Sequence, residues 1–545
     1  MKIAVGQVNV TVGDLPGNLA KLTAAVDEAR RGGAELVVFP EHALLGYPPR
    51  DLLHRAGFLD HAQQALAELT AASRGIGVVL GHVLPSGQQR ANRADPSATA
   101  FAGGEALHNV ACLLADGELA GVQAKHRLPT FDVFEETRYF TPGSDVTVVQ
   151  WAGLRLGLSV CEDLWYEGGV LEAQAQAGVD LLVNVSASPY FRGKPPLRHR
   201  LARQWAQLAG VPLVYTNLVG GEDELVFDGG SFAVRPDGGY LLAAPPFSEG
   251  VYWLDTGAAE VPAPAADGIG EVVQAIVVGI CDYVGKNGLP GAAVGISGGV
   301  DSAVTAALAT QALGPDRVVG AFLPGPYTAP ESAQQARALA HALGIRWLEI
   351  PIEPAYQALR AALGPHVELA GVVEENLQAR LRGLMMMAVS NATGHVVLCP
   401  GNKSEVAMGY NTLYGDTVGA LAPIGDLLKG EVYEVARYLN DQAGRPLIPA
   451  ETIARPPSAE LRPDQEDAQD LPPYPQLDPV VAALVVDNRP WQELADRFGN
   501  QLAGEVVRRL TRSEYKRRQL PLVIKVSPKA FGLGRRWPVT SRFSG

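Results

Sequence analysis

The chain has 545 residues, more than one hydrophobic core usually supports, so at least two domains are expected. Hydrophobic residues make up 47% of the sequence and charged residues 19%, as in globular proteins, and no apolar run is long enough to cross a bilayer. The net charge of -13 disfavours non-specific binding of nucleic acid over the whole surface.

The N-terminus and the cysteines indicate the cellular setting. Residues 1–10 (MKIAVGQVNV) alternate like a first strand and lack the apolar run and cleavage site of a signal peptide, which predicts a cytoplasmic protein. Cys112, Cys161, Cys281 and Cys399 form no CxxC pair, which argues against a disulfide framework and against a zinc site. A special role for any cysteine must therefore rest on that residue alone.

From residue 1 to residue 255, short runs rich in β-branched residues alternate with alanine-rich segments of helical period. This pattern predicts an α/β layered sandwich. Three polar side chains, Glu41, Lys125 and Cys161, each follow a strand-like run. Strand ends are where layered α/β folds gather catalytic groups from distant parts of the sequence. We therefore expect these side chains to meet.

A thiol beside a carboxylate and an ammonium group is suited to amide hydrolysis. Glu41 would take the proton of the Cys161 thiol, the thiolate would attack the amide carbon, and Lys125 would stabilise the oxyanion. Glu41 would then act as acid and base toward the leaving ammonia and the hydrolytic water. Taken singly, a buried cysteine is usually a small apolar residue and a lysine a surface charge. Only the three contexts together favour catalysis.

Residues 256–270 (TGAAEVPAPAADGIG) are rich in Pro, Ala and Gly without periodicity, which predicts a linker between a domain at 1–255 and a domain at 271–545. Beyond the linker, strand-like and helical segments alternate as in right-handed βαβ crossovers, so a doubly wound parallel sheet is predicted. The proline-rich, acidic residues 451–478 predict a long loop over a site.

The segment GAAVGISGGVDSAVTAALA passes from a strand through a glycine-rich turn into a helix. Glycines let the backbone approach phosphates, and the unpaired amides at the start of a helix favour anions. A lone Gly-Gly turn would be an ordinary strand-to-helix connection. No Lys follows the glycines, so the segment is not a Walker A loop. The complete hexapeptide 297–302 (SGGVDS) resembles the loop of the N-type ATP pyrophosphatases, which implies formation of an adenylate.

Further segments between residues 270 and 545 resemble the NAD synthetase family: ENLQARLRGLMMMAVSN, PGNKSEVAMGYNTLYGD, PIGDLLKGEVY and RSEYKRRQLP. Asparagine and GMP synthetases share the glycine-rich loop, but the segments ENLQAR and EYKRRQ are not theirs. For ATP, the resemblance implies binding by Gly295, Ile296, Ser297, Gly298, Gly299, Val300, Asp301, Ser302 and Pro400. For deamido-NAD, it implies contacts with Asn376, Glu405 and Lys516, and it places Mg²⁺ near Asp301 and Glu405.

Pro400 stands where the family usually has Thr, and proline supplies neither a hydroxyl nor an amide hydrogen, so any ATP contact there uses its carbonyl or its shape. Asp416 and Lys403 resemble site residues without an assigned role. Seen alone, Glu405 and Asp416 would be a first-turn helix carboxylate and a turn former.

Residues 501–545 carry eleven Lys and Arg against two Glu, which we ascribe to binding anionic nucleotides.

Over residues 1–250, the contexts of Glu41, Lys125 and Cys161 resemble the nitrilase superfamily, which implies a four-layer αββα sandwich. The resemblance to glutaminase domains of NAD synthetases implies that glutamine contacts Phe131, Ser188 and Lys194. Phe131 stands where that family commonly has Tyr, so a phenol hydrogen bond would be lost and a backbone contact kept. The resemblance further implies a second carboxylate near the lysine, Glu136.

The combined resemblance implies a reaction in which deamido-NAD, glutamine and ATP give NAD, glutamate, AMP and pyrophosphate, with Mg²⁺ and without zinc. It also implies a homo-oligomer, at least a dimer through the synthetase domain, with no nucleic-acid or membrane partner. Two alternatives remain open at this stage. The first half could be an uncoupled amide hydrolase, or it could be an oligomerisation module beside a synthetase that takes external ammonia.

Overall fold

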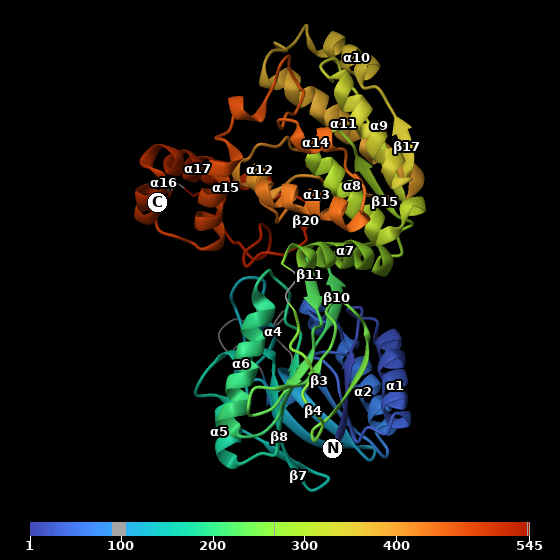
Figure 1. Ribbon diagram of the computed structural model, residues 1–545, viewed down its shortest axis with the longest axis vertical. Helices are drawn as coiled ribbons and strands as arrows, with labels where there is room; N and C mark the ends of the chain where they lie inside the picture. The colour runs from blue at the N-terminus through green and yellow to red at the C-terminus, as the bar shows by residue number, and fades with distance from the viewer. Residues whose placement is uncertain (90–104, 266–267, 542, 544–545) are drawn as a thin grey trace. The chain divides into compact units, whose positions relative to one another are not determined.

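The computed structural model describes residues 1–89, 105–265, 268–541 and 543, and it divides into two compact units (Figure 1). Unit 1 comprises Met1–Glu222 and Val226–Ala266, and unit 2 comprises Asp223–Leu225 and Asp267–Gly545. Over the part of the chain that the structure describes, none of the helices is both long and apolar enough to span a membrane.

Two six-stranded sheets pack face to face in unit 1. The first has the order β14-β1-β2-β3-β4-β5, with bounds Gly250–Asp255, Lys2–Gln7, Leu36–Val38, Gly77–Gln89, Glu105–Ala115 and Glu118–Ala124. The second has the order β13-β12-β9-β8-β7-β6, with bounds Tyr240–Ala243, Phe232–Val234, Leu213–Asn217, Leu181–Ser186, Leu154–Val160 and Val148–Trp151. Apolar residues from both inner faces, such as Val38 and Val183, form the core between the sheets.

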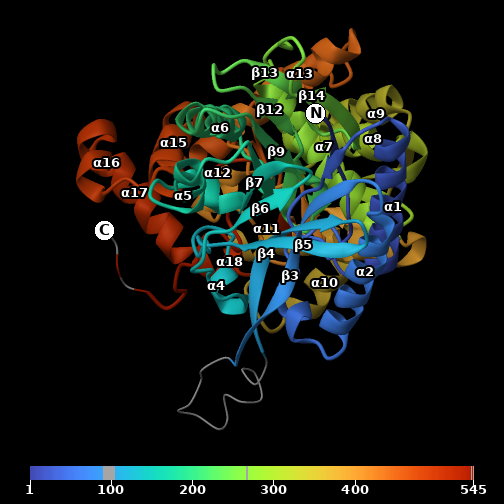
Figure 2. The same cartoon turned by 90° about the horizontal axis from the view of Figure 1, so that it is seen from below.

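Helices cover the outer faces of both sheets, α1 (Leu15–Arg31) and α2 (Phe58–Ala72) on the first and α5 (Val170–Ala177) and α6 (Lys194–Ala209) on the second (Figures 1 and 2). Each helix buries one apolar stripe, as the helical period of the sequence requires. The predicted four-layer αββα sandwich is therefore confirmed. The shorter elements are η1 (Arg50–His54), α4 (Glu136–Tyr139), η2 (Cys161–Trp165) and the hairpin strands β10 (Val219–Glu222) and β11 (Leu225–Asp228).

Unit 2 contains a six-stranded sheet in the order β17-β16-β15-β18-β19-β20, and all neighbouring strands are parallel. The bounds are Arg346–Glu349, Val318–Phe322, Ala292–Gly295, Val396–Leu398, Leu421–Ala422 and Leu522–Val523. The chain adds strands on one side of β15 and then returns to add strands on its other side. In such sheets ligands bind at the carboxyl ends of the strands where the order reverses, here between β15 and β18.

Helices pack on both faces of this sheet, which confirms the doubly wound prediction. Helices α8 (Val300–Leu313) and α9 (Pro330–Leu343) follow β15 and β16, and α7 (Ile269–Lys286) and α13 (Lys429–Ala443) pack on α8. Helices α10 (Glu353–Leu363) and α11 (Val372–Thr393) bury their apolar residues in a separate cluster against β15, β16 and β18. The remaining elements are η3 (Pro315–Arg317), α12 (Lys403–Met408), α14 (Ala450–Ala454), η4 (Asp467–Gln469), α15 (Tyr474–Val481), η5 (Ala482–Val486), α16 (Trp491–Phe498), α17 (Asn500–Arg512) and α18 (Glu514–Arg517).

Two segments differ from the sequence expectation in extent. Helix α7 begins at Ile269, inside the predicted linker, because its apolar stripe starts there. Of the predicted loop 451–478, residues 455–466 and 470–473 lack regular structure, and η4 lies between them. Helices α14 and α15 occupy its two ends, and α15 forms despite its prolines because Leu477, Val480 and Val481 share one buried face.

Candidate active sites

In unit 1, the structure brings together residues that follow three different strands. Glu41 lies beyond β2, Lys125 follows β5, and Cys161 follows β7. Lys125 Nζ donates a hydrogen bond of 2.8 Å to Glu41 Oε1. Strand β3 must approach this point closely, since a Cβ on Gly81 would lie 2.3 Å from Glu41 Cα. The glycine therefore allows the strand to pass directly beside the carboxylate.

A second carboxylate completes the ion network around the lysine. Glu136 Oε1 accepts hydrogen bonds from Lys125 Nζ at 2.7 Å and from the Tyr47 hydroxyl at 2.8 Å. Burial raises the pKa of Glu136 to about 7, and the charge of Glu41 adds to the rise while Lys125 opposes it. A network of buried charges contributes little net stability, so its presence points to function.

The environment assigns different protonation states to the thiol and to Glu41. Burial opposes ionisation of Glu41, but the charge of Lys125 prevails, together with hydrogen bonds from Lys125 and Asn109, and lowers its pKa. The pKa of Cys161 is raised by burial and by the charge of Glu41. The resting site thus pairs a protonated thiol with an ionised carboxylate, an acid and a base that catalysis can use.

Groups that the sequence analysis missed hold the carboxylate in place. Asn109 Nδ2 donates to Glu41 Oε1 at 2.7 Å, and the amide of Ala187 donates to Oε2 at 2.8 Å.

Cys161 itself adopts a left-handed conformation, with φ of 40°, in the turn from β7 into η2. Such a backbone is uncommon outside glycine and persists only where neighbouring contacts impose it.

The residues predicted to bind glutamine lie on two segments. Ser188 and Lys194 follow Ala187, whose amide contacts Glu41, and Lys194 Nζ donates to Pro189 O at 2.9 Å. The Ser188 amide donates to Asn217 Oδ1 at 2.8 Å. Phe131 lies in the segment between Lys125 and Glu136, and it is 53% exposed. Its ring packs edge-on against Phe134, with the ring centroids 5.6 Å apart.

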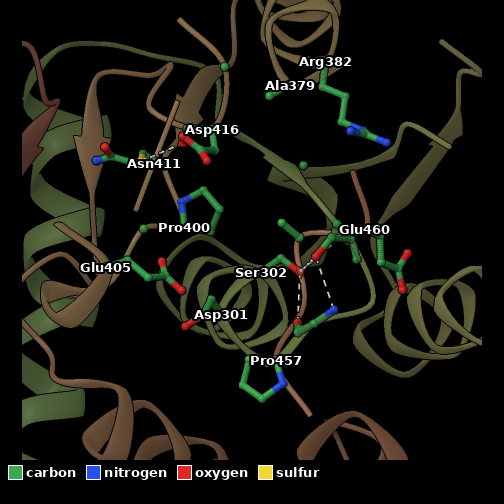
Figure 3. A pocket seen from close by; sticks show the side chains of 18 of the residues that line it. Asp301, Ser302, Ala379, Arg382, Pro400, Glu405, Asn411, Asp416, Pro457 and Glu460 are labelled. Atoms are coloured by element: carbon green, nitrogen blue, oxygen red, sulfur yellow. Dashed lines mark hydrogen bonds between the residues drawn. The ribbon is translucent and has the colours of Figure 1, made fainter. Parts of the chain in front are cut away.

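In unit 2, a cavity of about 300 Å³ lies at the carboxyl ends of β15 and β18, where the strand order reverses (Figure 3). Predicted ATP-binding residues line it: Gly295, Ile296, Ser297, Gly299, Val300, Asp301, Ser302 and Pro400. Gly298 instead packs behind the loop with φ of 90°, and a Cβ there would lie 2.6 Å from Ser332 O. The loop is closed by Ser302 Oγ, which donates to Gly299 O at 3.0 Å and accepts from the Ser297 amide at 3.1 Å.

Two carboxylates and a lysine face one another in this cavity. Lys429 Nζ lies 2.5 Å from Asp301 Oδ2 and 3.3 Å from Glu405 Oε1. Burial and the charge of Asp301 raise the pKa of Glu405 to about 8, although Lys429 opposes the rise. Lys429 belongs to the segment PIGDLLKGEVY, but the sequence analysis did not single it out; its position in the first turn of α13 is the signal that was available.

The carboxylate pair fits a hard divalent cation. Mg²⁺ prefers oxygen ligands and is held in nucleotide sites by one or two carboxylates together with phosphate oxygens. Within the described residues, no group of three or more His, Cys, Asp or Glu side chains is arranged to hold a metal ion. Asp301 and Glu405 would therefore share such an ion with the phosphates of a bound nucleotide.

The residues predicted to contact deamido-NAD converge on one segment, residues 409–412. Asn376 Oδ1 accepts from Thr412 Oγ1 at 2.8 Å, and Lys516 Nζ donates to Gly409 O at 2.8 Å. Glu405 O accepts from the Tyr410 amide at 2.9 Å. Glu405 lines the cavity, as do Tyr410 and Asn411 of this segment. Asn376 and Lys516 are not among the described lining residues, but they hydrogen-bond to the segment.

Asp416 and Lys403, the other two expected site residues, lie in different environments. Asp416 lines the cavity, and burial raises its pKa to about 6. Lys403 is not among the lining residues that the structure describes, because its Nζ donates to Asp426 Oδ1 at 2.8 Å and to Lys529 O at 2.7 Å. Lys403 thus holds the C-terminal segment.

The basic C-terminal segment is also largely engaged within the fold. Arg517 and Arg535 both contact Glu514 Oε2, at 2.9 Å and 2.8 Å. Arg509 pairs with Glu505 at 3.2 Å and donates to Asp470 O at 2.6 Å. Much of the positive charge that we ascribed to nucleotide binding therefore joins α17, α18 and the following chain.

Residues 455–461 form the side of the cavity opposite β18. Glu460 accepts a hydrogen bond from Ser332 Oγ at 2.6 Å, from the Ala329 amide at 3.2 Å and from Arg455 at 2.7 Å. We call this set of contacts the Glu460 latch, because it ties the loop to the start of α9. The expectation of a loop over a site is confirmed for these residues.

Comparison with known proteins matches both halves of the chain. The family described as carbon-nitrogen hydrolase matches residues 2–262, and the family described as NAD synthase matches residues 272–520. A glutamine-dependent NAD(+) synthetase of Synechocystis is 39% identical over 99% of each chain, and one of Xanthomonas campestris is 40% identical over 100% of this chain and 98% of its own. The solved glutamine-dependent NAD+ synthetase of Acinetobacter baumannii, in complex with ADP, is 33% identical over 99% of this chain and 98% of its own, with a TM-score of 0.77.

Proposed function

Since the chain belongs to the glutamine-dependent NAD(+) synthetase family, we propose that it makes NAD from deamido-NAD, ATP and glutamine, with release of glutamate, AMP and pyrophosphate. One observation carries this proposal: the chain holds both an amidase-like site in unit 1 and, at the switch point of unit 2, a cavity of about 300 Å³ lined by the glycine-rich loop. The first would supply ammonia, and the second would consume it.

Glutamine hydrolysis in unit 1 follows from the protonation states of its residues. Glu41 takes the proton of Cys161, and the thiolate attacks the side-chain amide carbon of glutamine. The Lys125 ammonium, oriented by Glu41 and Glu136, stabilises the oxyanion. Glu41 returns the proton to the leaving ammonia and then takes one from the water that hydrolyses the thioester, giving glutamate. Ser188, Lys194 and Phe131 would contact the rest of the glutamine.

Amidation in unit 2 requires an activated carboxylate. The loop 295–302 would hold the phosphates of ATP, with Pro400 beside them, while the segment supported by Asn376 and Lys516 would hold deamido-NAD. The nicotinate carboxylate attacks the α-phosphate, pyrophosphate leaves, and ammonia then displaces AMP from the acyl carbon. A magnesium ion held by Asp301 and Glu405 would neutralise charge on the phosphate oxygens.

The proposal is tested by NAD formation with glutamine or ammonium as nitrogen donor, in the wild type and in Cys161→Ala. We expect the variant to lose glutamine use and to retain ammonium use, because Cys161 belongs to unit 1 alone. Wild-type protein that forms no NAD with either donor would contradict the synthetase assignment. Unchanged glutamine use in Cys161→Ala would show instead that unit 1 is not the ammonia source.

We further propose that the chain forms a homo-oligomer through unit 2. Helix α11 presents exposed apolar side chains on one face, Val373 (46%), Leu384 (66%) and Met387 (38% exposed), while its other face packs on the sheet. Association would remove this face from water. Leu384→Glu should reduce the mass measured by light scattering to that of one chain, and Leu208→Glu, at a 62% exposed position of unit 1, should not. A cytoplasmic location stays a prediction.

A further inference from the structure

Asp163 makes an unusual set of contacts beside the amidase site. It lies in η2, two residues after Cys161, and is 2% exposed. Its Oδ1 accepts hydrogen bonds from the amides of His126 at 3.1 Å and Arg127 at 2.9 Å, and its Oδ2 accepts from the amide of Val160 at 3.3 Å. One carboxylate therefore receives backbone amides from two distant segments.

Those amides belong to the immediate neighbours of two reacting groups. His126 and Arg127 follow Lys125, and Val160 precedes Cys161. The two segments come from different sheets, since β5 is an edge strand of the first sheet and β7 belongs to the second. Among the described residues, no strand ladder joins β5 to β7. The Asp163 carboxylate links the segment after Lys125 to the segment before Cys161 through hydrogen bonds to their backbone amides.

The contact to Val160 also bears on the conformation of the nucleophile. Cys161 has φ of 40°, which surrounding contacts must impose. The hydrogen bond from the Val160 amide to Asp163 Oδ2 closes the turn that contains Cys161. Only an acceptor without donor hydrogens suits this position, because each oxygen of Asp163 faces an N–H group. An amide side chain would place its own N–H groups against one of these donors.

We propose that Asp163 is a positioning residue for glutamine hydrolysis, whose carboxylate sets the Lys125 ammonium and the Cys161 thiol at their working separation. This inference rests on the proposed function of unit 1. Asp163 acts through the backbone of its neighbours and carries none of the chemistry itself. Loss of the three hydrogen bonds to the Asp163 carboxylate would therefore slow the chemical step more than it weakens the binding of glutamine.

The test compares Asp163→Asn with Asp180→Asn in the full-length protein. Asp180 provides a matched control, since its Oδ2 accepts the Arg155 amide at 2.7 Å near the opposite end of β7. Misplacement of reacting groups by about 1 Å costs about 100-fold in rate. We expect Asp163→Asn to lower kcat for glutamate release by about tenfold to 100-fold, with KM for glutamine changed by less than about threefold. Alkylation of Cys161 by iodoacetamide should slow as well.

Ammonium-dependent NAD formation provides the internal readout for folding. It should stay at the wild-type level in both variants, and Asp180→Asn should keep its glutamine kcat. Wild-type kcat for glutamine in Asp163→Asn would overturn the inference, and so would an equal loss with both nitrogen donors, which marks a purely structural role. Wild-type protein that releases no glutamate would instead contradict the proposed function itself.

A second variant keeps the test decisive if Asp163→Asn does not fold. Asp163→Glu retains an acceptor-only carboxylate but moves it by one methylene, so the chain keeps the charge and loses the spacing. We expect normal ammonium use together with reduced glutamine kcat and slower alkylation of Cys161. Wild-type glutamine kcat in Asp163→Glu would overturn the positioning role.

Discussion

In unit 1 the catalytic ions contact one another in a closed group, and the side chains of Glu41, Lys125 and Glu136 are between 0% and 4% exposed. In unit 2 the carboxylates of Asp301 and Glu405 line a cavity of about 300 Å³ and are 19% exposed. Unit 1 has its cation in place before any substrate binds. Unit 2 has one lysine between two carboxylates at the place where polyanionic ligands would bind.

The closed ion group of unit 1 and the open cavity of unit 2 suit substrates of different charge. The reacting amide of glutamine is neutral, so the charges that stabilise its transition state must be supplied and oriented by the protein. ATP and deamido-NAD bring several negative charges with them. Lys429 is held by Asp301 and Glu405, and we expect ligand phosphates to replace or share those contacts. Unit 1 is preassembled, whereas unit 2 is completed by its ligands.

The largest expected effect tests the preassembled site. Glu41→Gln removes the base for Cys161 and one of the two carboxylates that orient Lys125. We expect glutamine-dependent NAD formation to fall by about 1,000-fold, within the range of general acid-base catalysis, and ammonium-dependent formation to persist. Glu118→Gln, at the exposed start of β5, is the control. Glutamine use above about a tenth of the wild-type rate would mean that another base serves Cys161.

The corresponding test in unit 2 removes the lysine between the carboxylates. Lys429→Met should lower NAD formation with either donor by about 100-fold, because the variant loses a positive charge near the proposed site of adenylyl transfer. Glutamate release by unit 1 should continue at its basal rate. Arg437→Met removes an exposed charge from the same helix, and it should leave both activities unchanged. Loss confined to the glutamine-dependent reaction would contradict the assignment of Lys429 to the synthetase cavity.

A smaller effect is expected at the Glu460 latch. Glu460→Gln weakens charge-assisted hydrogen bonds to Arg455, Ser332 and the start of α9, each worth about 1.5–3 kcal/mol. The loop 455–461 would then close the cavity less often, and KM for ATP should rise by about tenfold with either nitrogen donor. Glu466→Gln changes an exposed carboxylate of the same connection and is the control. An unchanged KM for ATP would show that the loop is held by other contacts.

The sequence predicts most of the preassembled site and less of the cavity. Glu41, Lys125 and Cys161 each follow a recognisable strand, and parallel layering brings strand ends together. The contacts of Asn109 and Ala187 with Glu41 depend on how the two sheets stack, which periodicity does not encode. The core strands were predictable because they are short runs rich in β-branched residues, set between segments of helical period.

In unit 2, the sequence does not show which lysine side chain points into the cavity, because that depends on how each helix is turned about its axis. Lys403 and Lys429 both lie in the first turn of a helix, and each is followed two residues later by a glutamate. The structure turns Lys403 toward Asp426 and Lys429 toward the cavity, a choice made by packing between α12, α13 and the C-terminal segment. The glycine-rich loop was predictable because its backbone geometry needs those glycines.

The smallest expected effect concerns the interior of unit 1. His82 lies in β3 and is fully buried, and its ring nitrogens find no hydrogen-bond partner among the described residues. Burial, with a smaller contribution from His42, lowers the pKa of His82 to about 3. In the unfolded chain a histidine titrates near pH 6.5. The unfolded state therefore binds more protons between these values, and the folded state loses stability as the pH falls below about 6.5.

This linkage predicts a pH-dependent difference between the wild type and His82→Phe. From pH 7 to pH 5.5, the single histidine should cost the wild type about 1 kcal/mol of unfolding free energy, and the variant should not pay this cost. Urea titrations followed by tryptophan fluorescence at both pH values measure the difference, and His61→Phe on the exposed side of α2 serves as control. Parallel pH dependence in wild type and His82→Phe would mean that water reaches the interior of unit 1. The preassembled site would then be solvated before glutamine binds, and the contrast with unit 2 would lose its physical basis.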